Sequence, residues 1–307
     1  MDLPSLIQPP LLKPGDRIAI VSPATIVNPD YIDGAARFLE SEGFSPVVMP
    51  HAKGPASGSF AASDNDRLDD MTDAWSDPAV RAILCARGGY GCNHLVDKIP
   101  LSSVSDDPKW LIGFSDISVL HALSLRAGVI SLHAPMAKHL TLLPPDHYCT
   151  RALMRILTEG LPVEYFAPPH PLNIYGEAEG ILIGGNLAVI NGLAAGPFDP
   201  MASEAPAILF IEDISEAIYA VERMLIRLRL AGQLDRVKGL VVGHFTEYRP
   251  DRNHPDMETM ISRLLGDAPF PVAFGFPAGH TDDNLPLALG SKAILTVTPD
   301  GTSLSMS

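Results

Sequence analysis

The stretch Trp110-Leu111-Ile112-Gly113-Phe114-Ser115-Asp116-Ile117-Ser118-Val119-Leu120 places an apolar run directly before a serine and a segment with helical spacing. A short apolar run that ends at glycine predicts a buried strand, and the spacing after Ser115 predicts a helix. Such a strand-to-helix turn presents a side chain at the carboxyl edge of a sheet, beside the N–H groups that begin the helix. The stretch therefore predicts an α/β fold and makes Ser115 a candidate nucleophile.

The same alternation runs through the first half of the chain. Apolar runs predict strands at 16–23, 45–49, 80–86 and 110–114, and helical periodicity predicts helices at 29–43, 64–75 and 116–127. Alternating strands and helices are typical of a parallel, doubly wound sheet. Ligands of such sheets bind beyond the carboxyl ends of the strands, where the serine turn and a glycine-rich turn at 87–91 both lie.

Clustered prolines interrupt this pattern between residues 161 and 177. We interpret this segment as a linker between an N-terminal α/β domain, residues 1–160, and a C-terminal domain, residues 178–307. In the second half, short strands are expected at 180–186, 206–211, 239–243 and 293–298, with one clear helix at 215–230. Short strands with few helices predict a smaller mixed domain of the β-rich or α+β kind.

Composition narrows the classes of partner. The net charge of −14 argues against nucleic acid, which needs clustered Lys and Arg. Every apolar run is far shorter than the roughly 20 residues that cross a bilayer, so no membrane partner is expected. The first ten residues do not read as a signal peptide, and three cysteines cannot complete a disulfide framework. These observations predict a cytoplasmic protein.

Each chemical interpretation of the two turns has a competitor. A serine before a helix is commonly an N-cap, and the hydrolase elbow G-x-S-x-G is matched only in part because Ile117 replaces its second glycine. The loop Arg87-Gly88-Gly89-Tyr90-Gly91 could cradle a phosphate, although it lacks the Lys-Ser/Thr of a P-loop. Beside a nucleophilic serine, a backbone N–H of this loop would instead stabilise an oxyanion.

A catalytic serine also needs a base and a group that orients the base. Among ten histidines, His280 stands out because it follows Gly279 in a polar turn, where its side chain can project into a cleft. Glu212 ends a buried apolar strand, and a carboxylate in that position is costly unless it is paired. The competing interpretation of Glu212 is a helix-capping or surface role beside Asp213.

Several motifs, in order along nearly the whole chain, resemble the LD-carboxypeptidase family, which contains the muramoyltetrapeptide carboxypeptidases. They are the serine turn at 113–116, the glycine loop at 87–91, Ile211-Glu212-Asp213, Gly279-His280, the strand at 16–24, Asp66-Arg67, Gly184-Gly185-Asn186-Leu187 and the strand at 238–243. The resemblance implies a flavodoxin-like N-terminal domain joined to a smaller C-terminal domain. It also implies a triad in which Ser115 is the nucleophile, His280 the base and Glu212 its orienting group, with the backbone N–H groups of Gly89 and Asp116 as oxyanion donors.

The activity implied by the resemblance is hydrolysis of the amide between an L-centre, meso-diaminopimelate or Lys, and a terminal D-amino acid. In murein tetrapeptide this releases D-alanine during cell-wall recycling. The resemblance further implies a small peptide or muropeptide substrate, a homodimer, and no cofactor or metal. Two alternatives stay open: an enzyme similar to microcin C immunity proteins that cuts aminoacyl or peptidyl nucleotides, and a non-catalytic protein that binds a nucleotide or sugar at the glycine loop.

Overall fold

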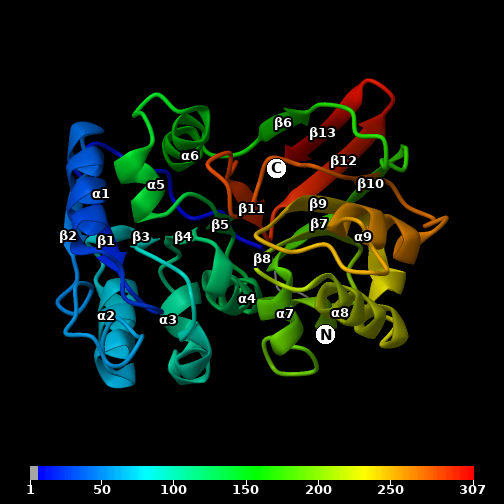
Figure 1. Ribbon diagram of the computed structural model, residues 1–307. Helices are drawn as coiled ribbons and strands as arrows, with labels where there is room; N and C mark the ends of the chain where they lie inside the picture. Colours follow the sequence, from blue (N-terminus) through cyan, green and yellow to red (C-terminus); the bar gives the residue numbers. More distant parts are fainter. Residues whose placement is uncertain (1–5) are drawn as a thin grey trace. The chain divides into compact units, whose positions relative to one another are not determined.

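The computed structural model describes residues 6–307, which pack into two compact units (Figure 1). The N-terminal unit contains residues 6–160 together with 285–288, and the C-terminal unit contains residues 161–284 and 289–307. The chain therefore returns to its first unit for four residues near its end. No sequence pattern predicted that residues 285–288 belong to the N-terminal unit.

The N-terminal unit is built on a six-stranded sheet with the order β11-β5-β4-β3-β1-β2. Its strands are β1 Arg17–Val21, β2 Ser45–Val48, β3 Val80–Cys85, β4 Trp110–Gly113, β5 Ser131–His133 and β11 Leu287–Leu289. The pairs β1·β2, β1·β3, β3·β4 and β4·β5 are all parallel. The order 2-1-3-4-5 is that of flavodoxin-like sheets, and the predicted doubly wound fold is confirmed.

Helices cover both faces of this sheet. They are α1 Pro29–Ser41, α2 Asp64–Ser76, α3 Leu101–Ser105, α4 Ser118–Arg126, α5 Ala137–Leu142 and α6 Tyr148–Glu159, with 3₁₀ turns η1 Cys92–His94, η2 Val96–Lys98 and η3 Ser115–Ile117. Figure 1 shows α1, α5 and α6 on one face and α2, α3 and α4 on the other. All four residues of β4 are buried because helices cover the sheet on both sides.

Local sequence explains where the long helices begin. Asn28 caps α1 by accepting a hydrogen bond from the N–H of Asp30, and Pro29 fills the first helical position, where a missing N–H costs nothing. Ser63 caps α2 in the same way by accepting from the N–H of Asp66. The predicted starts at 29 and 64 are therefore matched by the structure.

The C-terminal unit is built on a seven-stranded sheet with the order β10-β9-β8-β7-β12-β13-β6. Its elements are β6 Val163–Ala167, β7 Gly176–Asn186, α7 Leu187–Gly192, η4 Pro200–Ala202, β8 Ala207–Ile214, α8 Ile218–Leu230, η5 Gln233–Arg236, β9 Val237–Thr246, α9 Met257–Leu265, β10 Val272–Ala273, β12 Lys292–Thr298 and β13 Gly301–Met306. Strands β7 to β10 pair in parallel, whereas β12, β13 and β6 pair antiparallel. This confirms the mixed second sheet.

Two segments of this unit differ from the sequence-based expectation. The segment 161–177, expected to be a linker, contains the edge strand β6, which pairs with β13. Pro162 and Pro168 lie just outside this strand, so they do not interrupt its hydrogen bonds. The helix expected at 215–230 begins only at Ile218. Ser215 has φ of 62°, in the left-handed region, so the helix cannot start there. Among residues 6–307, no helix combines the length and apolar character needed to cross a membrane.

The contact between α1 and α5 generates a stability prediction. A Cβ on Gly34 would lie 2.5 Å from Thr141 Oγ1 and 2.8 Å from Thr141 Cβ. Thr141 Oγ1 is already held by the carbonyls of Tyr31 (2.8 Å) and Ala137 (2.7 Å). We expect Gly34→Ala to lower the free energy of unfolding by about 1–3 kcal/mol through overpacking, although alanine is the better helix former.

The matched control is Gly192→Ala at the last residue of α7, where no described atom lies within 4 Å of the added Cβ. We expect this control to be neutral or slightly stabilising. Denaturant unfolding of both variants measures the difference, and equal effects would contradict the packing argument.

Candidate active site

Ser115 sits in a strained turn at the carboxyl end of β4. Phe114 is extended, Ser115 has φ of 66°, and the 3₁₀ turn η3 continues directly into α4. The left-handed region is uncommon for residues other than glycine and occurs where the surroundings impose it. The cap positions of η3 and α4 are Phe114 and Ile117, and neither makes a side-chain cap hydrogen bond. Ser115 therefore does not serve as the N-cap that the sequence left open.

The glycine loop after β3 lies directly against this turn. A Cβ on Gly88 would lie 2.7 Å from Ser115 Cβ, 2.9 Å from Ser115 Oγ and 3.1 Å from the backbone N of Asp116. Side chains do not tolerate such distances, so only glycine fits at residue 88. The glycine loop and the serine turn therefore lie side by side, as the carboxyl-edge argument predicted.

Thr25 fixes the loop in this position. Its N–H donates to the carbonyl of Gly88 (3.3 Å), and its Oγ1 accepts from the N–H of Tyr90 (3.0 Å). Gly89 has φ of 105°, and a Cβ there would lie 2.7 Å from Thr25 Cβ. Within residues 6–307, the backbone N–H groups of Gly89 and Asp116 donate to no protein acceptor, which leaves both available to a ligand oxygen.

Two buried polar groups support the turn from behind. The Asp116 carboxylate accepts a hydrogen bond from the N–H of Cys92 (2.9 Å) and so ties the serine turn to η1. His121 is 2% exposed, with Nε2 2.9 Å from the carbonyl of Gly113 and Nδ1 2.9 Å from Ser131 Oγ. Burial lowers the pKa of His121 to about 4, against the opposing hydrogen bond to Gly113, so the ring is neutral and donates to that carbonyl.

In the C-terminal unit, Glu212 and His280 form a close pair. Glu212 lies near the carboxyl end of β8 and is fully buried, at 0% exposure, and its Oε2 lies 2.6 Å from His280 Nδ1. The preceding Gly279 has φ of 125°, and a Cβ there would lie 3.1 Å from Glu212 Oε2. The N–H of Gly279 donates to Asn284 Oδ1 at 2.9 Å, which fixes the turn. The bond from Nδ1 to a buried carboxylate holds the His280 ring in one orientation.

Asp213, next to Glu212, gives the Gly184-Gly185-Asn186-Leu187 motif a structural role that the sequence did not reveal. Burial, then the charge of Glu212, raises the pKa of Asp213 to about 6, although hydrogen bonds from neighbouring backbone groups oppose the rise. Its carboxyl accepts from Asn186 Nδ2 and from the N–H of Ala188, each at 2.8 Å. The Gly184-Gly185-Asn186-Leu187 motif thus holds the end of β7 to the end of β8, where Glu212 lies.

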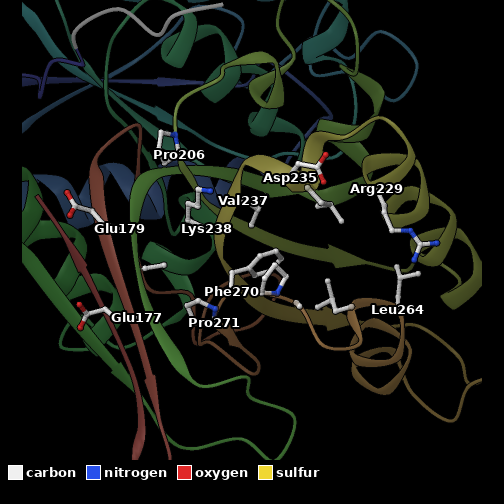
Figure 2. A pocket seen from close by; sticks show the side chains of 15 residues that line it. Glu177, Glu179, Pro206, Arg229, Asp235, Val237, Lys238, Leu264, Phe270 and Pro271 are labelled. Carbon is white, nitrogen blue, oxygen red and sulfur yellow. The ribbon is translucent and has the colours of Figure 1, made fainter.

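A separate pocket of about 660 Å³ lies in the C-terminal unit, at the amino ends of β8 and β9 (Figure 2). Figure 2 shows Val237 and Phe270 in its middle and the charged side chains of Glu179, Asp235 and Arg229 around them. None of the five predicted site residues lines this pocket. Glu212, which is on β8, lies toward the opposite end of that strand. Among residues 6–307, no group of three or more His, Cys, Asp or Glu is arranged to hold a metal ion.

The two-part sequence of the chain matches known family models. Residues 18–134 match the LD-carboxypeptidase N-terminal domain, and residues 179–295 match the LD-carboxypeptidase C-terminal domain. The chain belongs to the LD-carboxypeptidase family. This confirms the resemblance drawn from the sequence motifs. The positions of Ser115, Glu212 and His280 fall inside the matched ranges.

Named relatives cover nearly the whole chain. A probable murein peptide carboxypeptidase of Bacillus subtilis is 31% identical over 94% of this chain and 91% of its own length. A murein tetrapeptide carboxypeptidase of Pseudomonas aeruginosa is 29% identical, covering 91% and 92%. The crystal structure of a muramoyltetrapeptide carboxypeptidase from Oxalobacter formigenes has a TM-score of 0.85 at 30% identity, covering 95% and 98%. A microcin C7 self-immunity protein of Escherichia coli is 25% identical over 96% of this chain and 94% of its own length.

The buried His121 generates a prediction on pH. Its folded pKa of about 4 lies below the ordinary 6.5, so the unfolded chain takes up a proton that the folded chain does not. Its contribution to stability is complete above pH 6.5 and is lost as the pH falls toward 4. His121→Gln keeps an N–H donor for Gly113 and does not titrate.

We expect the unfolding free energy of the wild type minus that of His121→Gln to be constant above pH 6.5 and to decrease between pH 6.5 and 4. Denaturant titrations at several pH values measure this difference. Asp213, which titrates with the opposite sign in an overlapping range, cancels in it. A difference that does not change with pH would contradict a neutral buried ring.

Proposed function

We propose that this protein is a serine carboxypeptidase that hydrolyses the amide between an L-centre and a terminal D-amino acid, releasing D-alanine from murein tetrapeptide. The observation that carries the proposal is the close approach of the Gly88 backbone to Ser115 in a strained turn, where a Cβ at residue 88 would lie 2.9 Å from Ser115 Oγ. The Glu212–His280 pair adds an oriented base. The family relatives named as carboxypeptidases of murein peptides supply the substrate class.

In this mechanism Ser115 attacks the scissile carbonyl while His280 Nε2 takes its proton. Glu212 holds the ring through Nδ1 and stabilises the imidazolium that forms. The N–H groups of Gly89 and Asp116 stabilise the oxyanion of the tetrahedral intermediate. The proton then passes from His280 to the leaving amine of the D-amino acid, and an acyl ester on Ser115 remains. Water, deprotonated by His280, hydrolyses that ester and restores the serine.

A second candidate activity is hydrolysis of an aminoacyl or peptidyl nucleotide, which the microcin self-immunity relative favours. Proteins similar to the microcin C immunity proteins are expected to carry a longer segment between the nucleophile and the glutamate. We rank this activity second because this chain has no obvious added segment between Ser115 and Glu212. A cytoplasmic location, predicted from the sequence composition, stays a prediction. So do a role in cell-wall recycling and a homodimeric state, both implied by the family resemblance.

The nucleophile is tested by incubating the protein with purified murein tetrapeptide and following loss of D-alanine by mass spectrometry. We expect turnover by the wild type and a decrease of at least about 10⁴-fold for Ser115→Ala, because the covalent step is lost. Ser102→Ala, at an exposed serine of α3, is the matched control and should leave the rate unchanged. Full activity of Ser115→Ala would remove the serine from its role. Cleavage of an aminoacyl sulfamoyl adenylate in place of the tetrapeptide would favour the second activity.

The oxyanion role of the glycine loop is tested by Gly88→Ala. The added methyl must push the loop away from Ser115, and we expect kcat to fall about 10²–10³-fold with a smaller change in KM, as for loss of an oxyanion donor. Gly192→Ala, where the added Cβ meets no described atom within 4 Å, serves as the control for a glycine-to-alanine change. A Gly88→Ala enzyme with unchanged kcat would argue against backbone assistance from this loop.

A further inference from the structure

Tyr90 is a prominent side chain of the glycine loop that the proposed mechanism leaves unused. It follows Gly89, whose N–H is a proposed oxyanion donor, and the residue is 53% exposed. Its backbone is held through Thr25, so the start of the side chain is fixed relative to the loop. An exposed aromatic residue fixed beside a reacting centre is well placed to contact substrate.

The hydroxyl of Tyr90 ends a chain of three polar side chains. Tyr90 Oη lies 3.1 Å from His94 Nε2, at the end of η1. His94 Nδ1 lies 3.3 Å and 3.2 Å from the two carboxylate oxygens of Asp64, the first residue of α2. All three residues belong to the N-terminal unit.

The direction of the protons follows from Asp64. Burial alone would raise the pKa of this carboxyl, but hydrogen bonds from His94 and Arg67 outweigh it and lower the pKa below its usual range. An ionised carboxylate only accepts, so His94 directs its Nδ1–H to Asp64, and in the tautomer with the proton on Nδ1 the Nε2 atom is an acceptor. The Tyr90 hydroxyl therefore donates its single proton to His94. Its oxygen keeps a lone pair with which it can accept a hydrogen bond from a ligand.

Ring contacts hold this oxygen in place. The Tyr90 ring lies 5.7 Å from the Phe60 ring and 5.4 Å from the His94 ring, and the buried Arg67 guanidinium covers Phe60 at 4.7 Å. The neighbouring helix α2 carries five aspartates and one arginine, so the surrounding charge favours a cation over an anion. A fixed acceptor in an acidic environment is suited to an ammonium group.

We propose that Tyr90 is a specificity-determining residue whose hydroxyl oxygen accepts a hydrogen bond from the side-chain amino group of the substrate's L-centre residue. The inference rests on the proposed function, and it narrows the substrate to peptides with an amine-bearing L-centre. Diaminopimelate and Lys both carry such an ammonium, which has donors and no acceptor. A neutral isostere would leave the Tyr90 oxygen without this bond.

The test compares two tetrapeptides that differ only at the L-centre, one with Lys and one with norleucine, which lacks the amine. We expect the wild type to prefer the Lys peptide by about 10-fold or more in kcat/KM, as for a hydrogen bond to a charged group. Tyr90→Phe keeps the ring and removes the acceptor, and it should reduce the preference to within about 2-fold of unity. Unchanged hydrolysis of the norleucine peptide by this variant shows that it is folded.

Thr25→Val separates recognition from positioning of the loop. It removes the acceptor for the N–H of Tyr90, and we expect it to lower the rates of both peptides by a similar factor and to keep the preference for Lys. A Tyr90→Phe enzyme that keeps the wild-type preference, or that loses activity on both peptides equally, would overturn the inference.

Binding measurements separate this inference from the proposed hydrolysis. Calorimetric titration of Ser115→Ala with each peptide requires no turnover, and we expect the Lys peptide to bind about 10-fold more tightly. Adding Tyr90→Phe to that variant should abolish the difference. Equal affinities for the two peptides in Ser115→Ala overturn the role of Tyr90 whether or not the wild type hydrolyses either one. Failure of the wild type to release D-alanine, with the affinity difference present, would count against the proposed hydrolysis alone.

Discussion

The close approach of the glycine loop to the serine turn is the constraint on which the candidate site residues of the N-terminal unit depend. A methyl group at residue 88 does not fit against Ser115, and Ser115 itself adopts a left-handed conformation that the surroundings must impose. The surroundings are identifiable. The neutral ring of His121 bonds the carbonyl of Gly113, Asp116 bonds the backbone of η1, and Thr25 holds the glycine loop. The close approach and the strain are thus supported by hydrogen bonds on several sides.

In the C-terminal unit, the constraint is that two buried carboxyl groups, those of Glu212 and Asp213, are neighbours in the chain. Glu212 is paired with His280, while Asp213 is bonded by Asn186 and the start of α7. The two neighbouring acidic residues therefore have separate partners and separate tasks. Gly279 lets the histidine turn approach the glutamate, as Gly88 lets the loop approach the serine. In each unit a glycine marks the place where backbone must come close to a candidate site residue.

Much of the fold was predictable because its signals are local. Apolar runs located β1 to β4, and cap residues such as Asn28 and Ser63 located the helices. The misses have physical causes. The edge strand β6 is short and flanked by prolines, and its pairing with β13 joins segments far apart in the sequence. The start of α8 was placed too early because the left-handed backbone of Ser215 leaves no pattern in the residue types. The polar chain from Asp64 through His94 to Tyr90 also joins residues whose separate positions carry no common motif.

The sequence by itself determined the family, the doubly wound fold of the first half and the residue types available for chemistry. Motifs and periodicity depend on neighbours in the chain, and both can be read without coordinates. Only the tertiary structure decided that Ser115 is strained rather than a helix cap, that Gly88 lies too close to Ser115 for a side chain to fit and that Glu212 bonds His280. Those facts depend on distances between residues remote in sequence, which are set by sheet order and packing.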